Sequence, residues 1–167
     1  VDNTGGGGGG STTLDPAGGG VGGNGGSGIV IVRYPAPTAF TNRKVVKISN
    51  TSNTNTLTNY PVLLTVDTLA LFNAGKLQSD CDDLRFTDNA SSFDSAAWAN
   101  NYPYWIESGC KTTITKIWVK VNSIAASANK TIYMYYGNSS ALSLSSGNDV
   151  FDFFDDFSGT TIDTSKW

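Results

Sequence analysis

Two cysteines, Cys81 and Cys110, constrain the fold of this chain of 167 residues more than any other feature. They are the only cysteines and the chain has no histidine, so a Cys₄ or Cys–His zinc site is excluded. Their separation of 29 residues suits a single disulfide that closes a long loop, and two buried free thiols are the alternative. The surrounding sequence is typical of an exported protein, which favours the disulfide.

Charge is sparse, because only 15% of the residues are Asp, Glu, Lys or Arg and the net charge is -3. A nucleic-acid-binding surface needs a basic stripe, and no block of Lys or Arg occurs, so we expect no nucleic-acid partner. No apolar run approaches the roughly 20 residues that cross a bilayer, so we expect no membrane insertion. The absence of histidine also removes the commonest general base.

Residues 1–28 are dominated by glycine and hold 14 of the 19 glycines of the chain. One interpretation is a flexible linker. The other is a set of packed polyglycine helices similar to polyproline II, which have no internal hydrogen bonds and therefore need neighbouring segments or chains as partners.

Residues 29–38 predict a strand followed by a connector, because a β-branched run precedes Pro35 and Pro37. An exposed strand of this kind can add to the sheet of a neighbouring chain. The residues that we expect to serve this assembly contact are Ile29, Val30, Ile31, Val32 and Tyr34.

Residues 39–148 predict a sandwich of short strands separated by turns rich in Asn, Ser and Gly. In the clearest strand, Ile117, Val119 and Val121 alternate with Lys116, Trp118 and Lys120, which predicts one buried and one outward face. Strands are expected at residues 29–34, 43–49, 60–66, 84–87, 116–121 and 130–136, with a helical turn at 68–75 that begins at Asp67 or Thr68 and ends at Gly75.

The alternation at residues 84–87 places Leu84 and Phe86 on one face and Arg85 and Thr87 on the other. Residues 149–167 form a separate C-terminal segment, in which residues 150–157 predict an edge strand. The predicted fold is all-β: an antiparallel, jelly-roll-like β-sandwich with one short helix and an N-terminal glycine-rich extension.

Five motifs follow one another along the chain: YPVLLTVDT, AGKLQSDCDDLRFTD, YPYWIESGC, TKIWVKV and KTIYMYYGN. In this order they resemble a known family, the domain of unknown function 2341. The resemblance covers residues 40–148 and implies a β-sandwich in large exported bacterial, archaeal or phage proteins, with no established activity. One departure is the longer loop at residues 89–101.

Both ends of the chain carry further resemblances. The stretch GSGIVIVRY resembles the end of glycine-rich segments in tail-fibre-like and surface proteins of phages and bacteria. The stretch FDFFDDFSGTTIDTSKW resembles the opening of a concanavalin-like or laminin-G-like lectin module. These resemblances imply that the chain is a piece of a longer surface polypeptide.

Four aspartates surround Cys81 and are candidate calcium ligands, because Ca²⁺ prefers oxygen ligands at short spacing. They lack the pattern of a calcium-binding loop, and the alternative is a set of turn-capping aspartates with a surface pair between Asp83 and Arg85. No other cofactor is expected. The candidate ligands are Asp80, Asp82, Asp83 and Asp88.

Glu107 is the only glutamate and follows Trp105 and Ile106, an arrangement that resembles a catalytic carboxylate beside an aromatic floor. Glycoside hydrolysis needs two facing carboxylates, so we interpret Glu107 as a strand residue near Cys110 and expect no enzyme activity.

Flat aromatic side chains can stack on the apolar faces of sugars, so exposed tryptophans and tyrosines are candidates for carbohydrate binding. Trp118, on a Lys-flanked face, is the foremost of these candidates. The alternative, which is favoured, is that a further layer or a neighbouring subunit covers these side chains. The candidates are Trp98, Tyr102, Tyr104, Trp105 and Trp118.

The favoured functional hypothesis is a non-enzymatic structural module of an extracellular filament, fibre or virion surface. Its partners would be copies of itself or neighbouring surface subunits. The first alternative is an adhesin module that binds surface glycans through exposed aromatic side chains. The second is an accessory domain of a secreted enzyme that degrades polysaccharides.

Overall fold

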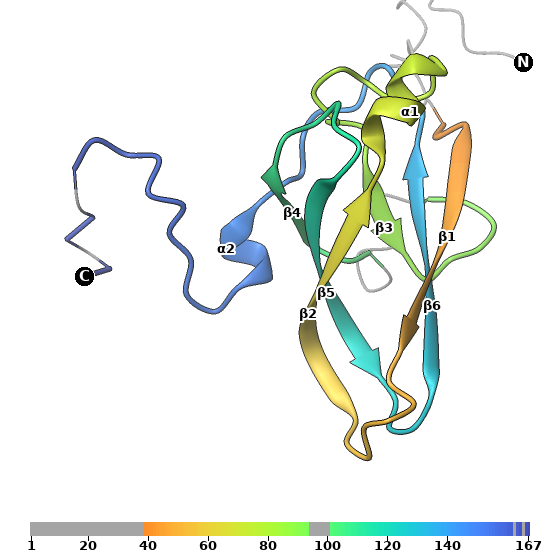
Figure 1. Ribbon diagram of the computed structural model, residues 1–167, viewed down its shortest axis with the longest axis vertical. Helices are drawn as coiled ribbons and strands as arrows, with labels where there is room; N and C mark the ends of the chain where they lie inside the picture. Colours follow the sequence, from red (N-terminus) through yellow and green to blue (C-terminus); the bar gives the residue numbers. More distant parts are fainter. Residues whose placement is uncertain (1–38, 94–100, 162, 165) are drawn as a thin grey trace, which may run out of the picture. The chain divides into compact units, whose positions relative to one another are not determined.

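The computed structural model describes residues 39–93, 101–161, 163–164 and 166–167 (Figure 1). The glycine-rich segment of residues 1–28, the predicted strand of residues 29–34 and Trp98 lie outside the described residues. The described part is an antiparallel sandwich of two three-stranded sheets, which confirms the predicted all-β fold.

The first sheet has the strand order β1-β6-β3, and the second has the order β2-β5-β4. Within the described residues, β1 and β2 are therefore the long strands at sheet edges. The strands are β1 (Asn42–Ser49), β2 (Leu57–Val66), β3 (Arg85–Thr87), β4 (Tyr104–Ser108), β5 (Thr115–Ile124) and β6 (Asn129–Tyr136).

The alternation predicted for β5 is confirmed. Ile117, Val119 and Val121 are fully buried between the sheets, whereas Trp118 and Lys120 lie on the outer face of the second sheet. Successive side chains of a strand point to opposite faces, so this one strand sets the register of the core. The buried apolar core comprises Val66, Leu77, Cys81, Leu84, Phe86, Tyr102, Tyr104, Ile117, Val119, Val121, Ile124, Ile132, Met134 and Tyr136.

The predicted helical turn is α1 (Thr68–Asn73). Its N-cap is Asp67, whose Oδ1 accepts a hydrogen bond of 2.9 Å from the Ala70 backbone nitrogen. Gly75 follows the helix with a φ of 68°, a left-handed conformation that glycine adopts without steric cost.

The prediction of an edge strand at residues 150–157 is wrong. A second short helix, α2 (Gly147–Val150), occupies its start, and the described residues from 151 onward form no strand. Asp155 and Asp156 accept bonds from the backbone nitrogens of Phe157 and Ser158. Such local side-chain bonds compete with strand pairing.

The end of the sandwich opposite α1 contains the β1–β2 and β5–β6 connections (Figure 1). Asn50 holds these connections together, because its Nδ2 donates to the backbone oxygens of Asn55 at 3.1 Å and Ala125 at 2.9 Å. Only 6% of Asn50 is exposed. This polar side chain therefore serves as a buried link between the two turns.

Candidate functional site

The disulfide between Cys81 and Cys110 is present, which confirms the predicted pairing over two free thiols. The Cα atoms are 5.8 Å apart. Cys81 precedes β3 of the first sheet, and Cys110 lies between β4 and β5 of the second sheet. The bond therefore joins the two sheets covalently.

Asp83 and Arg85 do not form the surface pair that was the alternative to a calcium site; only 1% of Asp83 and 7% of Arg85 are exposed. The Asp83 carboxylate accepts bonds from the backbone nitrogens of Gly137 at 2.8 Å, Gln78 at 3.1 Å and Asn138 at 3.2 Å. It thereby ties the segment before β3 to the end of β6.

The Arg85 guanidinium donates to three backbone oxygens, those of Asp82 at 2.8 Å, Leu84 at 2.6 Å and Leu142 at 2.6 Å. All three residues of β3 are buried, so the surface position expected for Arg85 is wrong. The reason is that the connection after β6 reaches Arg85 through Leu142. Sequence alternation fails where both faces of a strand are covered.

The four candidate calcium ligands are not brought together. Asp80 caps its own turn by accepting from the Asp82 nitrogen, whereas Asp88 contacts the Tyr102 hydroxyl and Lys130. Asp83 is occupied as described above. Among the described residues, no group of three or more metal-ligating side chains lies close enough to hold a metal ion.

Two of the predicted sugar-binding residues are core residues, because only 4% of Tyr102 and 2% of Tyr104 are exposed. Burial raises the pKa of both phenols, and the negative Asp88 beside Tyr102 raises that pKa further. Both hydroxyls therefore stay protonated at neutral pH. The Tyr102 hydroxyl donates to the Asp88 carboxylate at 3.3 Å, whereas the Tyr104 hydroxyl accepts from Arg85 Nη1 at 3.4 Å. Neither ring offers an open face for stacking on a sugar.

Trp105 and Trp118 are paired across β4 and β5 on the outer face of the second sheet. The segment after α2 covers them: the Phe154 ring lies 4.7 Å from the Trp105 ring and the Phe151 ring lies 5.4 Å from the Trp118 ring, edge to face. We call these four side chains the aromatic layer. Phe151 and Phe154 of this same chain therefore form the further layer that was predicted over Trp118.

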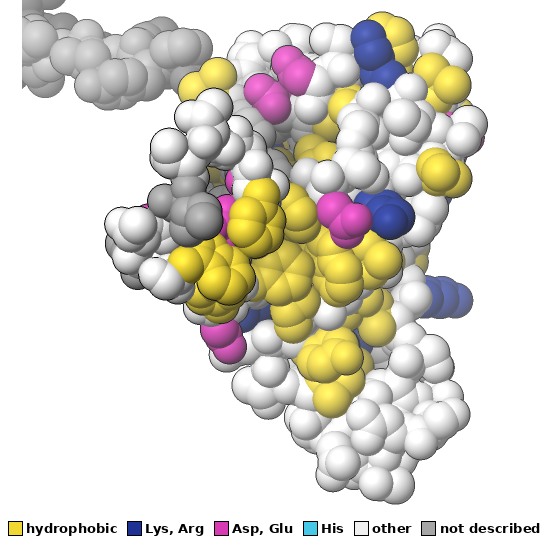
Figure 2. Space-filling model, turned by 60° about the vertical axis from the view of Figure 1, so that its left-hand side comes forward, with side chains coloured by type: hydrophobic (Ala, Val, Ile, Leu, Met, Phe, Trp, Pro, Cys, Tyr) yellow, Lys and Arg dark blue, Asp and Glu magenta, His cyan; other side chains and the backbone are white. Residues whose placement is uncertain are grey.

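Figure 2 shows hydrophobic side chains gathered on the side of the molecule that carries this layer. Glu107 stands beside it, and its carboxylate accepts from Trp118 Nε1 at 2.6 Å and from Lys116 Nζ at 3.4 Å. These two bonds hold the pKa of Glu107 below its ordinary value. The ionised Glu107 carboxylate therefore holds the Trp118 ring in place by accepting its N–H.

A second group of aromatic side chains lies in the same C-terminal segment and is largely exposed. The Trp167 ring lies 5.2 Å from that of Phe153 and 5.8 Å from that of Phe157. The exposed fractions are 57% for Phe153, 71% for Phe157 and 62% for Trp167. We call these three residues the exposed aromatic cluster; the predicted edge strand gave no indication of it.

Gly147 gives the aromatic layer a direct test, because a Cβ atom at this position would overlap the Phe154 ring. We expect Gly147→Ala to displace Phe154 from Trp105 and to destabilise the fold by about 1–3 kcal/mol, the usual cost of overpacking. Tryptophan fluorescence and limited proteolysis of residues 151–161 would report the displacement.

Gly159→Ala is the matched control, because a Cβ atom there meets only the Thr161 backbone oxygen at 3.4 Å. Equal protection of the C-terminal segment in both variants would contradict the packing described for Phe154.

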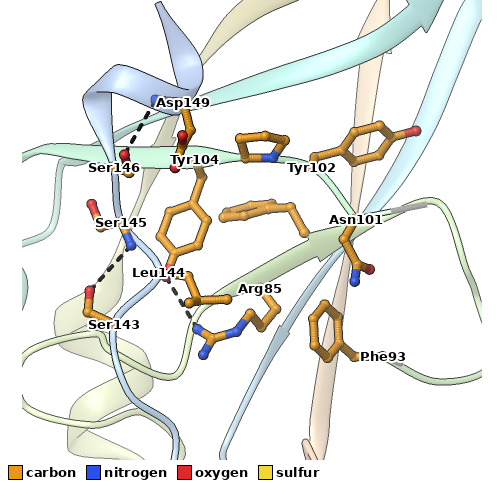
Figure 3. A pocket seen from close by; sticks show the side chains of 12 residues that line it. Arg85, Phe93, Asn101, Tyr102, Tyr104, Ser143, Leu144, Ser145, Ser146 and Asp149 are labelled. Carbon is orange, nitrogen blue, oxygen red and sulfur yellow. Dashed lines mark hydrogen bonds between the residues drawn. The ribbon is translucent and has the colours of Figure 1, made fainter. Parts of the chain in front are cut away.

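A pocket of about 420 Å³ opens between β3, the start of β4 and the connection that leads into α2 (Figure 3). Its apolar lining residues are Phe86, Phe93, Pro103 and Leu144, and the Asp149 carboxylate lies at its edge. The remaining lining residues are Arg85, Asn101, Tyr102, Tyr104, Ser143, Ser145, Ser146 and Asp149.

Within the described part of the chain, no helix is both long enough and apolar enough to cross a membrane.

Comparison with known families matches residues 80–167 to the family described as Domain of unknown function (DUF2341). The matched range starts later than the resemblance read from the sequence and includes residues 149–167. No curated protein and no solved structure matches the chain. The matched range contains the disulfide, β3 to β6 and the aromatic layer, and it spans more than half of the sequence. The chain therefore belongs to the DUF2341 family.

Proposed function

We propose that this chain is a non-enzymatic structural module of an extracellular filament, fibre or virion surface, where it packs against copies of itself or neighbouring subunits. The observation that carries the proposal is the exposed aromatic cluster, in which the Trp167 ring contacts the rings of Phe153 and Phe157 and all three side chains are more than half exposed. Gathered apolar side chains on a surface typically mark an interaction site.

The rigidity of the sandwich supports this role. At the α1 end, the disulfide joins the sheets, and Asp83 ties the end of β6 to the segment before β3. Thr68 and Thr115 add a buried hydroxyl pair at 2.6 Å between α1 and β5. A strand edge on such a frame, such as that of β1 or β2, loses little conformational entropy when a partner binds.

The disulfide also supports the proposed location, since such bonds persist in oxidising compartments and are rare in the cytosol. The fold would therefore keep its disulfide in a compartment outside the cytosol.

The contacts of Glu107 support a structural rather than a catalytic role, because both of its oxygens accept hydrogen bonds from neighbouring β5 side chains. The adhesin alternative is less well supported, because its candidate residues are not open to a sugar. Tyr102 and Tyr104 are buried, and Trp105 and Trp118 contact Phe154 and Phe151.

Strand addition offers a second assembly contact within the same proposal. Among the described strands, β1 and β2 lie at sheet edges, and edge strands present backbone groups to which another chain can add. The run at residues 29–34 has the β-branched composition of such an added strand. This contact would let the glycine-rich segment connect or pack neighbouring subunits.

Analytical ultracentrifugation and electron microscopy of the full chain test the proposal. We expect oligomers or fibres, and we expect Phe153→Ser combined with Phe157→Ser to reduce association at least tenfold, because the double variant removes exposed apolar area. Ile114→Ser is the matched control, since Ile114 is an apolar side chain with 66% exposure outside the cluster. A strictly monomeric unmutated chain would overturn the proposal.

A further inference from the structure

The pocket at the start of β4 combines two kinds of wall in a way that points to a ligand (Figure 3). Pockets that bind small molecules commonly have volumes of about 300–1,000 Å³ and a mainly apolar lining with a few polar groups. At about 420 Å³ this pocket has the volume for a small polar ring compound rather than a long chain.

Ser143, Ser145 and Ser146 belong to the extended segment that leads into α2, and all three line the pocket. Neighbouring residues of an extended segment point to opposite sides. Ser143 and Ser145 therefore turn away from the side toward which Leu144 points (Figure 3), and Ser145 Oγ accepts from the Ile106 nitrogen at 2.9 Å. Ser146 lies on the Leu144 side; its Oγ accepts from the Asp149 nitrogen at 3.4 Å and still has its own proton to donate to a ligand.

Asp149 supplies the acceptor. Its side chain is exposed and lines the pocket, and within the described part of the chain no donor contacts its carboxylate. A carboxylate accepts hydrogen bonds through both oxygens and can therefore receive two donors from one ligand. Charge-assisted bonds of this kind are stronger than those between neutral groups.

The apolar wall comes mainly from other segments of the chain. Phe93 and Pro103 are accessible at the mouth of the pocket, and 49% of Leu144 is exposed there. The rings of Phe86 and Tyr104 form the buried base, in contact with each other at 5.3 Å. A ligand that fits must present an apolar face to this wall and hydroxyl groups to the other.

We propose that this pocket binds a neutral saccharide of one or two rings. A sugar ring has C–H faces that pack on apolar side chains, and its hydroxyls both donate and accept. Vicinal hydroxyls would donate to Asp149 and accept from Ser146. The negative charge of Asp149 disfavours acidic sugars. The site is separate from the exposed aromatic cluster, so the inference does not depend on the proposed assembly.

Glycan-array screening of the full chain with neutral and uronate-containing oligosaccharides tests the inference. We expect retention of neutral glycans and about tenfold weaker retention by Asp149→Asn, because a charge-assisted bond is lost. Asp152→Asn is the matched control: it removes another exposed carboxylate of the same segment, one that pairs with Lys120 and does not line the pocket.

A second measurement follows backbone amide signals by NMR during titration with maltose, lactose and chitobiose. Shifts confined to the pocket residues Phe93, Asn101 and Leu144, weakened by Asp149→Asn in a folded variant, would support the inference. Absence of any retained neutral glycan, unchanged retention by Asp149→Asn, or binding abolished by Trp118→Ala alone would overturn it.

Discussion

Asp83→Ala should lower the free energy of unfolding by about 3–5 kcal/mol, because the backbone nitrogens of Gln78, Gly137 and Asn138 all lose their acceptor. Each unsatisfied buried donor costs about 1–3 kcal/mol, and water entry recovers part of this cost. Urea denaturation followed by circular dichroism would measure the change.

Asp80→Ala is the control for this prediction. The Asp80 carboxylate is exposed and accepts one local bond from the Asp82 nitrogen, so its loss should change stability by no more than about 0.5 kcal/mol. Comparable effects of the two substitutions would show that the Asp83 contacts are not a principal source of stability.

Removing the disulfide should destabilise the fold by about 3–4 kcal/mol, since Cys81 and Cys110 are 29 residues apart and the loop-closure entropy of the unfolded chain rises accordingly. For a domain of this size the midpoint of thermal unfolding should fall by roughly 10 °C. The double substitution Cys81→Ala with Cys110→Ala, compared with the unmutated chain under oxidising conditions, measures this effect.

A reducing agent supplies the matched control. It should destabilise the unmutated chain by a similar amount and leave the double variant unchanged. A shift of equal size in both proteins would mean that the reductant acts elsewhere. A double variant with the same unfolding midpoint as the oxidised, unmutated chain would rule out the entropic contribution.

Local sequence rules were sufficient to predict those elements whose burial and limits do not depend on contacts with distant segments. The alternation of Ile117, Val119 and Val121 predicted the buried face of β5, because one face of that strand meets the core and the other meets solvent or the aromatic layer. Asp67 and Gly75 marked the limits of α1 through their own backbone preferences.

Tertiary contacts decided the residues that sequence rules misplaced. Arg85 alternates like a surface residue, yet it is buried because the carbonyl of Leu142 lies 57 positions away in sequence and close in space. Tyr102 and Tyr104 are amphipathic, so a sequence does not distinguish a core position from a stacking surface. Their burial depends on the partner strand and on the segment that leads into α2.

The C-terminal segment shows a different limit. Phe151 and Phe154 are spaced three residues apart, a spacing that does not fit a strand, and this was the one local signal for the aromatic layer. The pocket had no such signal, because Ser143, Ser145 and Ser146 belong to a Ser-rich stretch that any surface loop could contain. Only the pairing of this stretch with β4 brings it to the edge of the pocket.

Asn50, the buried link between the two turns, also begins an Asn-Thr-Ser triplet, the acceptor sequence for N-linked glycosylation. In the folded chain its amide nitrogen donates to two backbone oxygens, and a sugar attached there would replace one of those hydrogens. A host enzyme would therefore reach Asn50 only before the strands close. A glycan found at this position would record that modification preceded folding.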